Sequence, residues 1–192
     1  MKTLTGKVIG RGVFGFAGLL LLTSCLGVPE GIKPIENFEL ADYLGTWHEI
    51  ARLDHRFERG LSGVTANYQR RLDGGVAVVN RGYNSETGQW RQAQGRAYFV
   101  NQSDVGHLKV SFFGPFYGSY VIFEKDPASQ VYAFVSGPDR SYLWFLAREP
   151  QVSGQLKQHF LEISRALGFA VDELVWVEQE PLAESAAPTS HP

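Results

Sequence analysis

Residues 107–148 read HLKVSFFGPFYGSYVIFEKDPASQVYAFVSGPDRSYLWFLAR, and this stretch decides the fold. Runs rich in Val, Ile, Tyr, Phe and Trp alternate with the turn signals Gly114-Pro115, Asp126-Pro127 and Gly137-Pro138-Asp139. Such runs are typical of β-strands, and Gly, Pro and Asp favour the tight turns between them. The stretch therefore predicts four consecutive antiparallel strands, approximately His107–Phe113, Gly118–Glu124, Val131–Ser136 and Ser141–Arg148.

Four similar runs precede this stretch, approximately at Gly45–Leu53, Gly63–Arg70, Val76–Gly82 and Trp90–Val100. Asp73-Gly74-Gly75 suits a tight hairpin between the second and third runs. Every link except the first is short, which favours an up-and-down meander of eight strands. Eight strands close into an all-β barrel without exposed edges, and the inside of such a barrel has room for one small ligand.

The hydrophobic period changes from that of a strand to that of a helix after Pro150. Apolar side chains recur at i, i+4, i+7 and i+11 with polar residues between them, at Leu156, Phe160, Ile163 and Leu167. Ser153 suits the N-cap and Gly168 the C′ position. The pattern predicts one amphipathic helix packed outside the barrel, followed by a short strand at Val175-Trp176-Val177.

The amino-terminal residues predict a leader and a lipid anchor. Three basic residues precede the apolar run 13–22, which is too short to span a bilayer as a helix, so residues 1–24 are interpreted as a signal peptide. Leu22-Thr23-Ser24-Cys25 resembles a bacterial lipobox, and Cys25 is the only cysteine. We expect acylation of Cys25 and, because Leu26 is not aspartate, sorting to the outer membrane on its periplasmic side. Ordinary cleavage that leaves a free thiol is the alternative.

The mature chain has the size and charge of one globular domain. Its 168 residues carry 15 Lys and Arg against 20 Asp and Glu, which argues against nucleic acid as a partner. Residues 25–36 contain two glycines and two prolines and predict a lipidated tether. Residues 37–178 would form the domain, and residues 179–192, rich in Ala, Ser and Pro, a disordered tail.

Gly45-Thr46-Trp47, at the start of an eight-stranded meander, resembles the opening motif of the lipocalin family. The stretches 45–52, 54–60, 112–118 and 137–140 are similar to the outer-membrane lipocalins of bacteria, so the resemblance covers nearly the whole chain. It implies that Gly45, Trp47 and Arg148 close the narrow end of the barrel, with the Arg148 guanidinium packed across the indole. Lys125-Asp126-Pro127 departs from the Thr-Asp-Tyr of many lipocalins, since only Asp126 matches.

Alternation along the strands predicts which side chains line the interior. If Trp47 faces inward, Glu49 and Ala51 do so too, and an inward Arg148 implies inward Leu146, Trp144 and Tyr142. The resemblance places Asn67, Val110 and Phe112 inside as well. The candidate ligand-binding residues are therefore Trp144, Tyr142, Phe112, Val110, Asn67 and Glu49. They predict a mostly apolar pocket, in which the Glu49 carboxylate must be hydrated, paired or protonated, whereas a solid core is the alternative.

Two further groups of residues lie near the predicted mouth of the barrel. Arg56 and Arg59 in the first loop suit either a carboxylate or phosphate headgroup or salt bridges within a solvated loop. Aromatic residues crowd the turn at 112–117, and the outward ones suit a membrane-touching or dimer-forming patch.

Enzyme motifs are missing from the sequence. The five histidines lack zinc-ligand spacing, and neither Gly-x-Ser-x-Gly nor a phosphate-binding glycine loop occurs. The sequence predicts no catalytic residue, metal or cofactor. We expect an outer-membrane-anchored lipocalin, monomeric or homodimeric, that stores or transports a fatty acid, lysophospholipid or similar amphiphile. The alternatives are a carrier of haem or another pigment and an envelope scaffold without a ligand.

Overall fold

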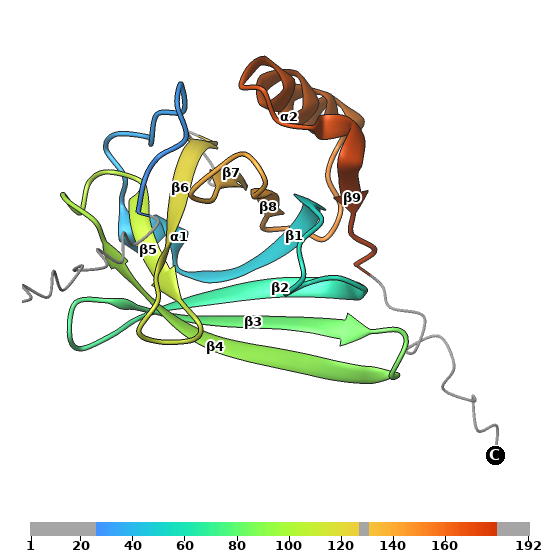
Figure 1. Cartoon of the computed structure of the whole chain (residues 1–192), viewed down its shortest axis with the longest axis horizontal. Coiled ribbons are helices and arrows are strands. Elements are labelled where there is room, and N and C mark those ends of the chain that lie inside the picture. The colour runs from blue at the N-terminus through green and yellow to red at the C-terminus, as the bar shows by residue number, and fades with distance from the viewer. Residues whose placement is uncertain (1–25, 127–130, 180–192) are drawn as a thin grey trace, which may run out of the picture.

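The fold is an antiparallel barrel of eight strands, as predicted (Figure 1). The computed structural model describes residues 26–126 and 131–179. Neighbouring strands pair in the order β2-β3-β4-β5-β6-β7-β8-β1, and an additional β1–β2 pairing closes the barrel. The strands are β1 (Gly45–Leu53), β2 (Leu61–Arg70), β3 (Val76–Asn84), β4 (Gln89–Phe99), β5 (His107–Ser111), β6 (Gly118–Lys125), β7 (Tyr132–Ser136) and β8 (Leu143–Ala147).

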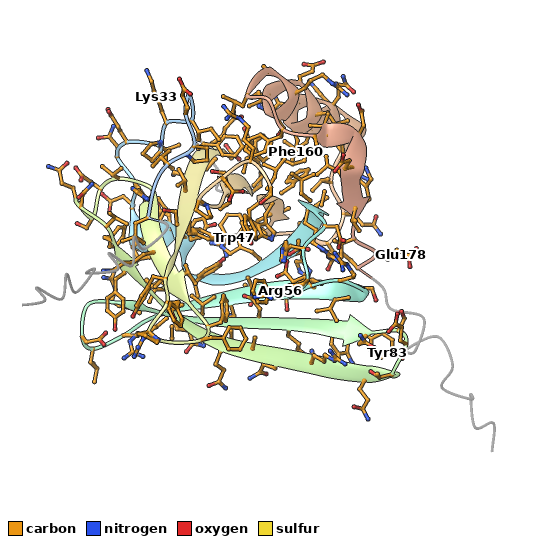
Figure 2. All side chains as sticks on the ribbon, viewed as in Figure 1. Lys33, Trp47, Arg56, Tyr83, Phe160 and Glu178 are labelled. Carbon is orange, nitrogen blue, oxygen red and sulfur yellow. The ribbon has the colours of Figure 1, made fainter. Side chains whose placement is uncertain are left out.

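One long helix, α2 (Gly154–Ala166), packs on the outside of the barrel, as the apolar stripe predicts. Ser153 caps it, because its side chain accepts a hydrogen bond from the Leu156 N–H. Figure 2 shows Phe160 on the face of α2 that is turned toward the strands, and its ring centre lies 4.8 Å from those of Phe134 and Phe145. The chain continues through the 3₁₀-helix η1 (Val171–Glu173) into β9 (Leu174–Trp176), which pairs with β1.

The segment before the barrel is packed against it, which differs from the predicted tether. Val28 and Ile32 join the apolar cluster between α2 and the strands. The Ile35 N–H donates to the Ile122 carbonyl, and the Gly106 N–H donates to the Ile35 carbonyl. The predicted tether as far as residue 36 thus lies against the barrel from Val28 onward, because its apolar side chains pack on the cluster under α2.

The predicted tail also begins later than expected. Gln179 is held on the barrel, where its side-chain amide donates to the Glu49 carbonyl at 2.6 Å and its oxygen lies 3.1 Å from His48 Nδ1. The signal peptide, Cys25 and residues 180–192 of the predicted tail lie outside the described residues.

The two ends of the barrel differ in how they are filled. The short helix α1 (Leu40–Tyr43) lies at the end where β1 begins, and its Tyr43 packs in the interior core. The loops 54–60, 112–117 and 137–142 lie at the other end, where β1 finishes. We call these the closed and the open end. β4 pairs with β5 only from Arg96 to Phe99, so its first half, toward the open end, pairs with β3 alone.

Candidate functional site

The closed end is sealed by residues from α1, β1 and the end of β8. Trp47 is fully buried, and its indole N–H donates to the Tyr43 carbonyl at 2.8 Å. The Arg148 guanidinium lies 3.9 Å from the centre of the Trp47 ring and donates to the carbonyls of Asp42 (2.7 Å), Leu44 (2.9 Å) and Thr46 (2.9 Å). A cation over an indole is stabilised by the ring quadrupole. These contacts join α1 to β1 and to the end of β8, and they leave the fully buried indole without access to a ligand.

A chain of three tyrosine hydroxyls lies in the interior. The Tyr120 hydroxyl is 2.7 Å from that of Tyr43 and 2.8 Å from that of Tyr68. Burial raises the pKa of all three hydroxyls, so they stay protonated at neutral pH. Two bonds use two of the three hydroxyl hydrogens, and the third can be donated to another acceptor.

A buried charged cluster lies between this chain and the open end. The Arg52 side chain is only 1% exposed, and it donates to Glu49 Oε1 at 2.7 Å and to the Glu58 carbonyl at 2.7 Å. The Glu49 carboxylate, which had to be hydrated, paired or protonated, is thus paired with a guanidinium. Arg52 Nε is buried without a hydrogen-bond partner among the described residues, so one charged donor of the cluster remains unused.

Glu58 attaches the first loop to the barrel wall. Its Oε2 accepts the indole N–H of Trp144 at 3.1 Å and lies 2.9 Å from Nε2 of His55. Tyr142 stacks on Trp144 with 5.9 Å between ring centres and 26° between ring planes. Loop 54–60 therefore folds back over the mouth, where sequence reasoning expected it only to flank the opening.

The two acids of the cluster differ in their affinity for protons. Burial and the neighbouring Glu58 raise the pKa of Glu49 well above its ordinary value, against the opposing effect of Arg52. Burial also acts on Glu58, but its contacts with His55, the Trp144 N–H and Arg52 outweigh that effect and lower its pKa. Glu58 is therefore the more acidic member of the pair, and Glu49 keeps its proton to a higher pH than Glu58 does.

A β-bulge in β1 brings Arg52 into the interior. On the β8 side, Glu49 is opposite Leu146 and Ala51 is opposite Phe145, so Ile50 is an extra residue. Beyond the bulge the alternation reverses, and Ala51 packs in the outer cluster under α2. The prediction of an inward Ala51 is therefore wrong, and Arg52 takes the inward position instead.

Apolar side chains also line the interior, beside the charged cluster and across from it. Val110 and Phe112 pack against the interior core, as do Trp144 and Leu146 from β8. The Phe112 ring lies over Gly95, where a Cβ atom would come within 2.8 Å of it, so this position requires glycine. By alternation from Ala97, the first half of β4 turns Gln89, Arg91 and Ala93 inward, and all three remain exposed. Solvent thus reaches the inner face of the barrel near the open end.

Asn67 lies on the outer face of the barrel, contrary to the sequence-based expectation. Its neighbours Ala66 and Tyr68 point into the interior core, so alternation turns Asn67 outward. There its side-chain amide donates to the Thr46 hydroxyl at 2.8 Å. The other five candidate ligand residues face the interior.

The hollows described on the surface lie away from the candidate ligand residues. Two hollows of about 320 and 230 Å³ lie outside the barrel, one between Gly31 and α2 and one beside Trp176, and neither contains a candidate ligand residue. Within residues 26–126 and 131–179, no three or more His, Cys, Asp or Glu side chains are grouped to hold a metal ion. None of the helices in these ranges has the length and apolar character needed to cross a membrane.

Comparison with known proteins identifies the family. The Lipocalin-like domain family matches residues 38–179. The chain is 55% identical over 170 residues to the outer membrane lipoprotein Blc of Vibrio cholerae, covering 88% of this chain and 99% of that protein. It is 48% identical over 163 residues to Blc of Escherichia coli K12, covering 85% and 92%.

The fold also has distant solved relatives. Insecticyanin of the tobacco hornworm Manduca sexta superposes with a TM-score of 0.65 at 18% identity, covering 82% of this chain and 89% of that one. The names of the bacterial relatives confirm the predicted location at the outer membrane. The chain therefore belongs to the lipocalin family, among the outer-membrane lipoproteins of bacteria.

Proposed function

We propose that the barrel binds a fatty acid, lysophospholipid or similar amphiphile and stores or transports it at the outer membrane. The observation that carries the proposal is the partly exposed inner wall near the open end, which includes Tyr142, Trp144, Val110 and Phe112. Inward apolar side chains that contact water can bury more apolar surface when an apolar ligand enters. The lipocalin family points to a binding or transport protein.

The energetics of this wall suit a long apolar chain. Burying roughly 16 methylenes at about 0.8 kcal/mol each gives about 13 kcal/mol, from which association subtracts at least about 4 kcal/mol. Micromolar or tighter binding is therefore within reach. Glu49, Arg52 and Glu58 would lie beside the chain, where the unused Arg52 Nε–H is a donor for a polar group of the ligand.

The Trp144 indole provides the test, because it lines the proposed path of the acyl chain. We expect a saturable change of fluorescence when delipidated protein is titrated with a long-chain fatty acid or a lysophospholipid. The change should largely vanish in Trp144→Phe, which keeps an apolar ring and removes the reporter. It should persist in Trp90→Phe, because Trp90 stacks under Arg81 on the outer face of the β3–β4 hairpin.

Two outcomes would count against the proposal. A full signal in Trp144→Phe would place the acyl chain away from this wall. No response of the wild-type protein to any amphiphile would favour an envelope scaffold without a ligand. Thermal melting of both variants checks that the loss of the Trp144–Glu58 hydrogen bond has not unfolded the loop.

A further inference from the structure

Three large apolar side chains are exposed at the open end. Phe57 is 54%, Phe113 68% and Phe116 71% exposed, and they come from the two loops 54–60 and 112–117. The rings of Phe57 and Phe113 stack, with centres 6.1 Å apart and planes at 26°, so the two loops form one surface. Apolar surface of this kind usually marks an interaction site, since the core gains nothing from it.

Positive charge surrounds these rings. The Arg56 guanidinium lies 4.9 Å from the Phe57 ring, while Arg96 and Lys109 lie 6.0 and 5.3 Å from the ring of Tyr117 at the base of the other loop. Among the ion pairs of the described residues, none involves Arg56, Arg96 or Lys109. The acids of the first loop do not compensate, because Asp54 pairs with Arg59 and Glu58 is turned inward.

We propose that this rim, formed by Phe57, Phe113, Phe116, Arg56, Arg96 and Lys109, docks on an anionic lipid surface and presents the mouth of the barrel to the membrane. Phenylalanine rings enter the boundary between headgroups and acyl chains, and arginine and lysine contact lipid phosphates. The chain has a formal charge of −2, so the cationic rim is a local feature that suits this one surface.

Two observations favour a membrane as the binding partner of the rim. The relatives are outer-membrane lipoproteins, and the first packed apolar residue, Val28, follows the proposed lipidation site Cys25 by three residues. Three extended residues span at most about 10 Å, so an acylated Cys25 would hold the barrel on the bilayer surface. A second copy is a poorer partner, because a two-fold interface would bring two identical cationic rims together.

The test uses the lipidated protein in vesicles, with an environment-sensitive dye on a single introduced cysteine. Acylation blocks Cys25, so Phe113→Cys carries the only free thiol, and a labelling ratio of one verifies this. The matched control is Leu72→Cys, which replaces a fully exposed apolar side chain in the 71–75 turn at the closed end. Vesicles of phosphatidylcholine with and without phosphatidylglycerol vary the surface charge.

We expect the dye at position 113 to shift to the blue and to be quenched several-fold more by spin-labelled lipid than the dye at position 72. The difference in quenching between the two positions should shrink without phosphatidylglycerol and in the double variant Arg56→Gln/Lys109→Gln. Equal quenching at both positions, or stronger quenching at 72, would overturn the proposal. A blue shift without vesicles that grows with protein concentration would overturn it in favour of a second copy.

The docking test does not depend on a bound ligand. If amphiphile titration fails while position 113 is still quenched, the proposed ligand function is wrong and the docking surface stands. If Phe57→Ser/Phe113→Ser/Phe116→Ser keeps the Trp144 titration, ligand binding and docking are separate properties.

Discussion

At the scale of single residues, the unusual feature is a buried guanidinium, Arg52, beside two buried acids, of which it bonds the carboxylate of Glu49 and the backbone carbonyl of Glu58. Removing two acids and an arginine from water costs more than their attraction returns unless each charge is well paired. Arg52 donates to the Glu49 carboxylate and to the Glu58 carbonyl, and its Nε has no hydrogen-bond partner within residues 26–126 and 131–179. We infer that the cluster positions the first loop rather than adding stability.

Glu49→Gln should remove a pH-dependent loss of stability. Because the pKa of Glu49 is raised above its ordinary value of 4.5, the folded chain keeps a proton that the unfolded chain has lost. The free energy of unfolding therefore falls as the pH rises from about 4.5 to the pKa of folded Glu49. Within this window the difference in unfolding free energy between wild type and variant should change by about 1.4 kcal/mol per pH unit.

Urea unfolding at several values between about pH 5 and about pH 8 measures this difference, since the other titrating groups cancel between the two proteins. Glu36→Gln, at an exposed acid outside the barrel, is the matched control. A difference that stays constant with pH would show that Glu49 is ionised in the folded protein.

At the scale of elements, the sequence predicts the strands and the helix well but not their irregularities. β1 has the predicted bounds, and α2 begins after the predicted cap Ser153. The alternation rule fails beyond Ile50, because a bulge inserts one residue and leaves no pattern in the sequence. The inward position of Arg52 was missed for this reason, although a charged residue late in an apolar strand is itself a signal.

The side-chain directions in loop 54–60 also could not be predicted from the sequence. The sequence left open whether its arginines contact a headgroup or form salt bridges within the loop; Arg59 pairs with Asp54 in solvent, as the second alternative expects, and Arg56 lies over Phe57 on the rim. Glu58 makes the inward contact instead. Which side chain of an irregular loop turns inward depends on distant partners such as Trp144, and local sequence does not encode that choice.

Arg148→Ala should lower the stability of the closed end. The guanidinium joins the end of β8 to α1 and β1 through three carbonyls and the Trp47 ring. Since the group is partly exposed, we expect a loss of about 1–2 kcal/mol. Chemical unfolding measures this loss. Arg148→Lys keeps the charge without the planar guanidinium, so its stability should lie between those of the wild type and Arg148→Ala. Unchanged stability together with lost amphiphile binding would instead make Arg148 part of the binding site.

At the scale of the whole molecule, the closed half of the barrel contributes to stability, and the open half contains the proposed binding surfaces. The closed half is filled by buried rings such as Phe38, Tyr43 and Trp47, whereas inward side chains of the open half contact solvent. The outer cluster under α2 stiffens the wall on the side of β7 and β8. Mutations at the closed end should therefore change stability, and those near the open end should change the proposed ligand and membrane contacts.

Cys25→Ser tests how the molecule is held at the membrane. If two acyl chains on Cys25 anchor it, the wild type should stay with the outer-membrane fraction through a high-salt wash. The serine variant should be released as a folded domain or accumulate with its leader uncleaved, and intact mass distinguishes these cases. Any association left in the released variant would come from the cationic rim, so salt should remove it by screening. A wild-type mass without acyl groups, together with a serine variant that resists the wash, would show that the protein is held in another way.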